Sequence, residues 1–426
     1  MRKVNKKNIT TLILLVVVCA ICSVSVFLYI NRKQDSTVNQ TGTYLDTVDS
    51  NELKENIETK FDQSYKLQDY LVYGQTLSFY QNTYDGKISD PMQGNNISLR
   101  NVMSDETTSF TFSGKADTGV DLGSLEEGIY EIYVYDHYQK KRVYFKEAFT
   151  ADTFTSMRNK GSVNSVVLTA DKDILSNYDI SFDKNYAFLI VTKETADKDI
   201  YDVVIDPIGN SVDYETKYVD YGGSTDLMDE QATSLAYAKK VKKELESYGL
   251  KVKILRKQDE TLGYYEEDSR IARAYASKAK VYLALGASFD EDVDAPYMLV
   301  SPYTNSGLGN RIAYTFENSG LNVYQARSDT TQEEGVLSDS FNLNDNHEYS
   351  EFEVYPQLRE SGGKATYAGK YMSNNENYSS NYGMYGLYFV FASVNNATSV
   401  DNFNTNQKKM TKYLVKGICE YFDIKG

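Results

Sequence analysis

The residue types that carry out metal or acid–base chemistry are sparse in this chain of 426 residues. It contains two histidines, His137 and His347, which stand far apart in the sequence. A hydrolytic zinc site takes three protein ligands and keeps one position open for water. Two distant loops would have to converge to build one here, and the sequence shows no nucleophile motif, phosphate-binding loop or Cys/His cluster. We therefore expect no cofactor, no metal and no catalytic residue.

Two acidic clusters offer alternatives. Asp290, Asp292 and Asp294 have the spacing with which calcium-binding loops begin, but the chain lacks the Gly and the Glu that an EF-hand needs further on. A weak cation site and a solvated acidic loop both remain open there. Residues 266–268 (Glu-Glu-Asp) could act as paired acids on a glycoside. They precede a predicted helix, however, and helix capping explains them with no further assumption.

Glu230 is the third candidate, and it stands in the first turn of a predicted helix. A carboxylate there is favoured by the positive end of the helix dipole. We prefer that structural interpretation to a retained metal ligand.

The stretch 201–289 must position these residues, because predicted strands and helices alternate along it. Its strands are expected at 201–207, 251–255 and 280–285, and its helices at 229–248 and 268–277. This alternation predicts right-handed crossovers and a mostly parallel sheet with helices on both faces. Ligands of such sheets bind beyond the carboxyl ends of the strands. A further helix at 309–319, a strand at 387–390 and a closing helix at 407–422 complete this α/β domain, which we place at 199–426.

An all-β domain is expected before it, at 69–198. Apolar and polar residues alternate in short runs at 109–113, 129–135, 142–145 and 186–192, and residues 136–141 have the composition of a hairpin connection. These runs predict a β-sandwich of immunoglobulin-like type. It could bind carbohydrate or act as a spacer.

The amino-terminal segments predict membrane attachment. Residues 1–8 are basic, and residues 9–30 are apolar, uncharged and long enough to span a bilayer. Lys and Arg are denser before the span than after it, which predicts a cytoplasmic amino terminus and an extracytoplasmic bulk at the cell membrane. A cleaved signal peptide is the alternative. Residues 31–68 are expected to form a polar tether with one short amphipathic helix.

Net charge narrows the classes of partner, and cysteine content limits the possible disulfides. The net charge is −15 and the isoelectric point is near 4.8, which argues against nucleic acid and anionic membrane surfaces as partners. Only Cys419 lies outside the apolar span, so the remainder cannot form an internal disulfide.

Residues 201–422 resemble the zinc-dependent N-acetylmuramoyl-L-alanine amidases of the amidase-3 type. The resemblance covers about half of the chain and rests on several segments in order: VVIDP at 203–207, Glu230 at a helix start, ELESYGLKVKILR at 244–256, residues 269–274 with KAKVYLALGAS at 278–288, and residues 387–396 with the final helix. It implies an amidase-like fold and a peptidoglycan substrate.

The chain departs from this family at the residues of its chemistry. The resemblance places Gly209 and Gly286 where the family has its zinc-binding histidines, and Phe391 where it has its general-base glutamate. Only Glu230 is retained. We therefore expect a degenerate domain whose vestigial cleft at Gly209, Glu230, Gly286 and Phe391 binds a ligand, with the two glycines leaving open room.

Three functions follow as expectations. The first is a non-catalytic module that binds peptidoglycan or a cell-wall enzyme. The second is an active peptidoglycan amidase with a rearranged site, and the third is a structural scaffold of the envelope.

Overall fold

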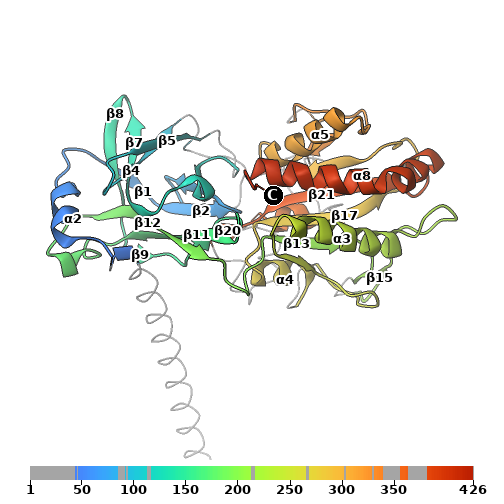
Figure 1. The fold of residues 1–426 in the computed structure, drawn as a ribbon, viewed down its shortest axis with the longest axis horizontal. Coiled ribbons are helices and arrows are strands. Elements are labelled where there is room, and N and C mark those ends of the chain that lie inside the picture. The colour runs from blue at the N-terminus through green and yellow to red at the C-terminus, as the bar shows by residue number, and fades with distance from the viewer. Residues whose placement is uncertain are drawn as a thin grey trace, which may run out of the picture.

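The computed structural model describes residues 44–45, 47–84, 92, 95–112, 117–212, 216–264, 268–301, 304–328, 331–338, 356–362 and 381–425. The predicted span 9–30, its basic flank 1–8 and the tether to residue 43 lie outside these ranges. Within them, no helix has the length and apolar character that crossing a bilayer requires. The described residues form an all-β body and an α/β body that lie side by side along the longest axis (Figure 1).

The described residues of the all-β body form two sheets. Among the described residues the larger sheet has nine strands: β1 (Ser64–Leu67), β4 (Asn96–Asn101), β5 (Thr107–Thr111), β7 (Gly128–Asp136), β8 (Gln139–Phe145), β9 (Phe149–Thr150), β10 (Phe154–Thr155), β11 (Ser162–Ala170) and β12 (Asn185–Thr195). The smaller sheet contains β2 (Asp69–Tyr73), β3 (Thr76–Tyr80), β6 (Val120–Asp121) and β20 (Tyr382–Gly383). The predicted hairpin connects β7 to β8.

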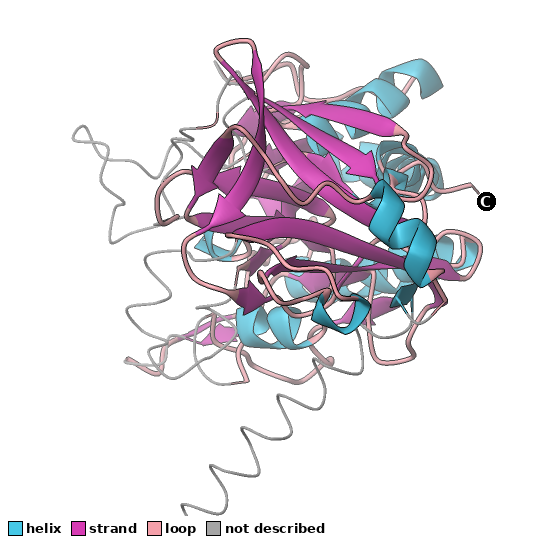
Figure 2. Ribbon diagram, turned by 90° about the vertical axis from the view of Figure 1, so that its left-hand side faces the viewer, coloured by secondary structure: helices cyan, strands magenta, loops and turns pink. Residues whose placement is uncertain are grey.

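Side-chain alternation along the strands explains why this body has two cores. On β7, Ile132 and Val134 point into the core between the two sheets, whereas Ile129 points to the outer face. The helix α2 (Ser50–Asn56) covers that outer face through Leu53 (Figure 2). The predicted amphipathic helix therefore packs on its own chain, and Asp49 caps it by accepting the N–H groups of residues 51 and 52.

Two details of the β-domain prediction are corrected. The sheet begins at β1, before the predicted boundary at residue 69, and β1 pairs in parallel with β8. The arrangement is also not an immunoglobulin-like sandwich, because β20 comes from the carboxyl-terminal part of the chain and pairs in parallel with β2. A local alternation pattern cannot reveal a partner strand that lies about three hundred residues away.

The α/β body is built on a mostly parallel sheet, as predicted. Its strand order is β16 (Val252–Ile254), β13 (Val203–Pro207), β17 (Val281–Ser288), β21 (Tyr385–Ser393), β18 (Tyr297–Val300) and β19 (Val336–Ser338). Among these strands β18 runs antiparallel to β21. On one face lie α3 (Glu230–Ser247), α5 (Gly307–Ser319) and α8 (Ala397–Tyr421), and on the other lie α4 (Arg270–Ala276) and α6 (Pro356–Glu360). Most of the polar segment 338–382 lies outside the described residues.

The two bodies share a continuous core and a set of polar bonds. Leu71, Tyr73 and Met157 of the all-β body belong to the same buried cluster as the α3, α5 and α8 face of the sheet. Strand β20 pairs with β2, and the chain then continues directly into the central strand β21. The all-β body is therefore docked on the α/β sheet rather than joined to it by a free linker.

Candidate functional site

The carboxyl ends of the parallel strands bring Gly209, Glu230 and Gly286 together, as the sequence predicts. The Glu230 carboxylate accepts two backbone hydrogen bonds, from Gly223 N–H at 2.8 Å and from Ala287 N–H at 2.7 Å. Gly209 lies beside Gly222, which in turn lies next to the carboxylate. One side chain thus connects the start of α3, the glycine loop and the end of β17.

Local sequence explains this placement of Glu230. Asp229 caps α3 by accepting the N–H of Ala232 at 2.8 Å, which starts the helix at residue 230. Gly222 has φ +86°, and a Cβ there would lie 2.9 Å from Oε2 of Glu230. The glycine therefore lets the loop backbone approach the carboxylate closely.

Glu230 is a buried carboxylate that no described cation neutralises through an ion pair. Its exposed fraction is 2%, and burial raises the pKa of its carboxyl group above the ordinary value. The two backbone N–H donors oppose that rise because they stabilise the charged form. Since each oxygen already accepts a bond from the backbone, its observed role is to fasten three segments together.

The open room predicted at Gly286 is absent. A Cβ built on Gly286 would lie 2.1 Å from the Tyr388 hydroxyl oxygen and 2.9 Å from Oε1 of Glu230. At Gly209, where φ is +93°, a Cβ would lie 2.8 Å from the carbonyl oxygen of Tyr221. Neighbouring groups therefore fill the space that the two glycines leave, which corrects the expectation of an empty groove.

Phe391 lies in the core, away from this edge. It is fully buried, and its ring centroid lies 4.7 Å from that of Phe403 on α8 and 5.6 Å from that of Tyr237 on α3. Successive side chains of a strand point to opposite faces of the sheet, and Phe391 points into the helical layer. The predicted place of Phe391 in the ligand-binding cleft is thus corrected: the ring stabilises the packing of helices on the sheet.

Two buried arginines hold the turn after β13, and sequence analysis missed both of them. Arg270 forms an ion pair with Asp206 and donates to the carbonyl oxygen of Gly209 at 2.6 Å. Arg256 donates to the carbonyl oxygens of Pro207 at 2.9 Å and Ile208 at 3.0 Å. Burial and the nearby Arg270 lower the pKa of Arg256 to about 10. The available signal was their position: one follows a strand and the other starts a helix at the same edge.

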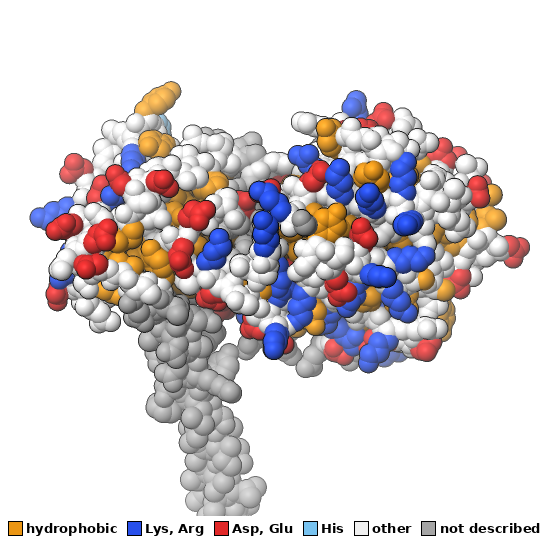
Figure 3. Space-filling model, in the orientation of Figure 1, with side chains coloured by type: hydrophobic (Ala, Val, Ile, Leu, Met, Phe, Trp, Pro, Cys, Tyr) orange, Lys and Arg blue, Asp and Glu red, His pale blue; other side chains and the backbone are white. Residues whose placement is uncertain are grey.

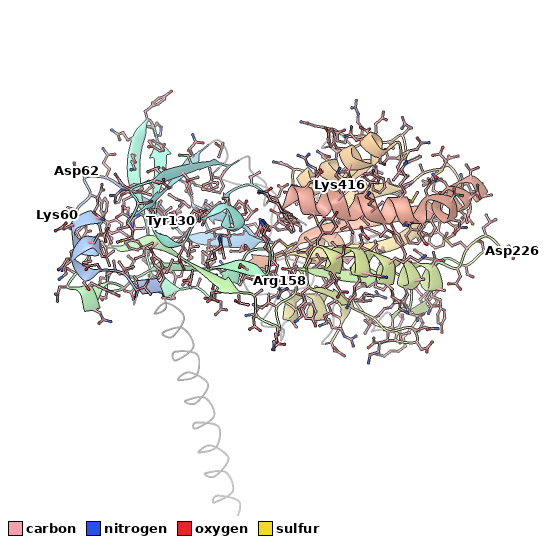
Figure 4. The ribbon with its side chains drawn as sticks, viewed as in Figure 1. Lys60, Asp62, Tyr130, Arg158, Asp226 and Lys416 are labelled. Carbon is pink, nitrogen blue, oxygen red and sulfur yellow. The ribbon has the colours of Figure 1, made fainter. Side chains whose placement is uncertain are left out.

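The solvent side of this edge carries exposed apolar side chains. The edge patch consists of Tyr218, Tyr221, Leu227 and Phe289, which are 46% to 68% exposed. Phe289 follows β17 and packs beside Gly223, while Tyr218 and Tyr221 flank the short strand β15 (Val219–Asp220), which pairs with β14 (Ser211–Val212). Figure 4 places Asp226, next to Leu227, at the end of the α/β body farthest from Arg158 at the junction. The patch therefore faces away from the all-β body.

The other sequence candidates do not form a metal site within the described part of the chain. There, no group of three or more His, Cys, Asp or Glu side chains is arranged to hold an ion. In the 290–294 loop, Oδ1 of Asp290 accepts the N–H of Asp292 at 2.9 Å. His137 is exposed at the β7–β8 turn and lies 2.7 Å from Asp136, and Asp268 pairs with Arg273 at 2.8 Å. His347 and residues 266 and 267 lie outside the described ranges.

Comparisons with known proteins give structural matches only. No family model and no curated protein matches the chain. One similar solved structure is the N-acetylmuramoyl-L-alanine amidase AmiC2 of Nostoc punctiforme. It is 18% identical with a TM-score of 0.33, and the match covers 54% of this chain and 99% of that chain. The catalytic domain of the amidase CwlV from Bacillus (Paenibacillus) polymyxa is 18% identical with a TM-score of 0.34, over 53% of this chain and 100% of that chain. The CwlD amidase from Clostridioides difficile, in complex with the GerS lipoprotein, is 14% identical with a TM-score of 0.30. The match covers 53% of this chain and 100% of that chain.

Proposed function

We propose that this protein is anchored in the cell membrane, faces outward and binds peptidoglycan without cleaving it. One observation carries the proposal: both oxygens of Glu230 accept backbone N–H bonds, and the Tyr388 hydroxyl fills the space beside Gly286. A carboxylate used in this way fixes the shape of the edge. The one histidine among the described residues, His137, lies at the exposed β7–β8 turn and not beside it. The choice of peptidoglycan comes from the sequence resemblance, and a cell-wall enzyme is the alternative partner.

The edge patch supplies the contact. Tyrosine and phenylalanine rings offer flat apolar faces, and tyrosine adds a polar hydroxyl, so they suit the mixed surface of a glycan. Tyr221 is 64% exposed and lies just before Gly223, and Phe289 is 60% exposed and lies just after Ala287. The N–H groups of Gly223 and Ala287 are the two that Glu230 binds. Glu230 therefore holds the backbone that presents these rings, which links the buried carboxylate to ligand binding.

The test is sedimentation of the detergent-solubilised full chain with insoluble peptidoglycan. Replacing both rings (Tyr221→Ala with Phe289→Ala) should weaken binding about tenfold or more, because burying an apolar side chain such as Phe contributes about 1.5–3 kcal/mol and about 1.4 kcal/mol is a factor of ten. The matched control is Tyr138→Ala, which removes an exposed tyrosine from the β7–β8 turn and should leave binding unchanged. Loss of binding in the control instead would place the contact on the all-β body.

Catalysis is tested separately on the same preparation. Wild-type protein should release no stem peptides from peptidoglycan. Release that Glu230→Gln abolishes would contradict the proposal and establish a hydrolase with a rearranged site.

A further inference from the structure

Lysines gather on the outer side of two neighbouring helices although the whole chain carries a net charge of −15. The lysine strip consists of Lys239, Lys240 and Lys243 on α3 with Lys408, Lys412 and Lys416 on α8. Figure 3 shows the blue side chains crowded on this face of the α/β body, while red ones are frequent on the all-β body. We infer that the lysine strip binds a linear, phosphate-bearing polyanion, a function distinct from peptidoglycan binding at the edge patch.

The two helices present these lysines as adjacent rows. Lys408, Lys412 and Lys416 recur every four residues, so they lie on one side of α8 about 6 Å apart along its axis. Lys239 and Lys243 have the same spacing on α3. Lys240 donates a hydrogen bond to Gln407, which shows that the rows lie next to each other. The strip therefore repeats positive charge at regular intervals along one direction.

The structure leaves most of this charge without an internal counter-charge. Lys416 pairs with Glu420 at 3.5 Å, but the other five lysines form no ion pair with any residue that the structure describes. Like charges four residues apart on a helix destabilise it by roughly 0.2–0.5 kcal/mol per pair. The fold gains nothing from this repulsion, so an external anion that relieves it is the simplest reason for the arrangement.

The shape of the strip favours a linear anion over a flat one. Exposed acidic side chains border it: Glu246 on α3, Asp401 at the start of α8 and Glu420 near its end. Glu244 on α3 is half-buried and lies near Tyr248, as Lys416 and Glu420 do. A planar anionic bilayer pressed against this face would meet them within a screening length of about 8 Å. A linear chain can follow the lysine rows and avoid these carboxylates. Lysine binds phosphate as a point charge and needs no bidentate geometry, so phosphate groups spaced along a chain suit these rows.

The test measures binding of the full chain, in neutral detergent, to long-chain inorganic polyphosphate over a range of salt concentrations. The triple variant Lys408→Gln, Lys412→Gln, Lys416→Gln should lose at least about tenfold in affinity and show a shallower salt dependence, by about one unit of slope per lysine removed. The matched control makes the same charge change on the all-β body, at the exposed residues Lys66, Lys146 and Lys172. It should keep nearly wild-type affinity.

Three outcomes would overturn the inference. Wild-type protein could fail to bind polyphosphate, or both triple variants could lose affinity equally, which would show only a general charge effect. Binding to phosphatidylglycerol vesicles without binding to polyphosphate would assign the strip to a membrane surface instead. Because peptidoglycan sedimentation tests the edge patch through different residues, failure of either proposal leaves the other intact.

Discussion

The two edges of the α/β sheet differ in the kinds of side chain that they carry. At the amino-terminal edge, the residues that precede β13 and β17 are Asp202 and Lys280, and both are 1% exposed beneath the all-β body. Asp202 pairs with Arg158 at 2.6 Å, and Lys280 donates to Thr155 at 2.6 Å. At the carboxyl-terminal edge, Glu230 accepts hydrogen bonds from two backbone amides, and the exposed surface side chains are apolar, most of them aromatic.

The difference shows how the all-β body leaves the carboxyl-terminal edge of the sheet uncovered. A parallel sheet presents all its amino ends on one side and all its carboxyl ends on the other, and ligands use the carboxyl side. Docking the all-β body through charged and tyrosine side chains at the amino edge stabilises the pair of domains without covering the edge patch. Tyr385, the first residue of β21, illustrates this because its hydroxyl bonds to Thr76 of β3.

The largest expected effect comes from breaking the amino edge with Asp202→Ala. The carboxylate accepts bonds from Arg158 N–H at 3.0 Å, from its guanidinium and from Lys251 N–H at 2.7 Å. Its removal leaves buried positive charge unpaired, so the free energy of unfolding should fall by about 3–5 kcal/mol. Urea unfolding measures the change.

An exposed ion pair provides the control for this variant. Glu246→Ala removes the partner of Lys242 on the surface of α3, where the pair is 3.4 Å long. It should change stability by no more than about 0.5 kcal/mol. Similar losses in the two variants would mean that the junction is no more stabilising than an ordinary surface contact.

Lys280 at the amino-terminal edge should make the stability of the protein depend on pH. Burial lowers the pKa of Lys280 from 10.5 to about 8. Between about pH 8 and 10.5 the unfolded chain therefore binds a proton that the folded chain has released, so stability rises with pH in this window. Relative to Lys280→Met, wild type should gain about 3 kcal/mol across it, at 1.36 kcal/mol per pKa unit. Unfolding both proteins in urea across this window checks the sign, and a constant difference would assign Lys280 an ordinary pKa.

The smallest effect concerns the filled space at the carboxyl edge. In Gly286→Ala the new methyl group would meet the Tyr388 hydroxyl at 2.1 Å, so overpacking should cost about 1–3 kcal/mol. Thermal unfolding measures this cost, and the Tyr388→Phe background should reduce it because the hydroxyl is gone. If Gly286→Ala lowers the melting temperature in neither background, the open groove that the sequence predicts would be present after all. The larger Gly286→Trp is expected to unfold this edge rather than merely block it.

The sequence by itself determined the order of elements in the α/β body, because that order depends on local periodicity. Residue spacing and capping within short windows predict the helix start at Asp229, the strands around 203–207 and 281–288, and helices on both faces. It also brought Gly209, Glu230 and Gly286 to one edge, since parallel strands align their carboxyl ends. The closing helix was predicted from residue 407 but begins at Ala397, because polar residues fill its first turns.

Tertiary structure alone decided what those residues do there. Whether a glycine opens a groove depends on which distant side chain approaches it, and Tyr388 comes from a neighbouring strand. The face to which Phe391 points depends on strand register, which a single residue does not reveal. The pairing of β20 with β2 and the adjacency of the lysine rows on α3 and α8 both join residues far apart in sequence. Such contacts are products of chain packing, so periodicity and motif spacing carry no signal for them.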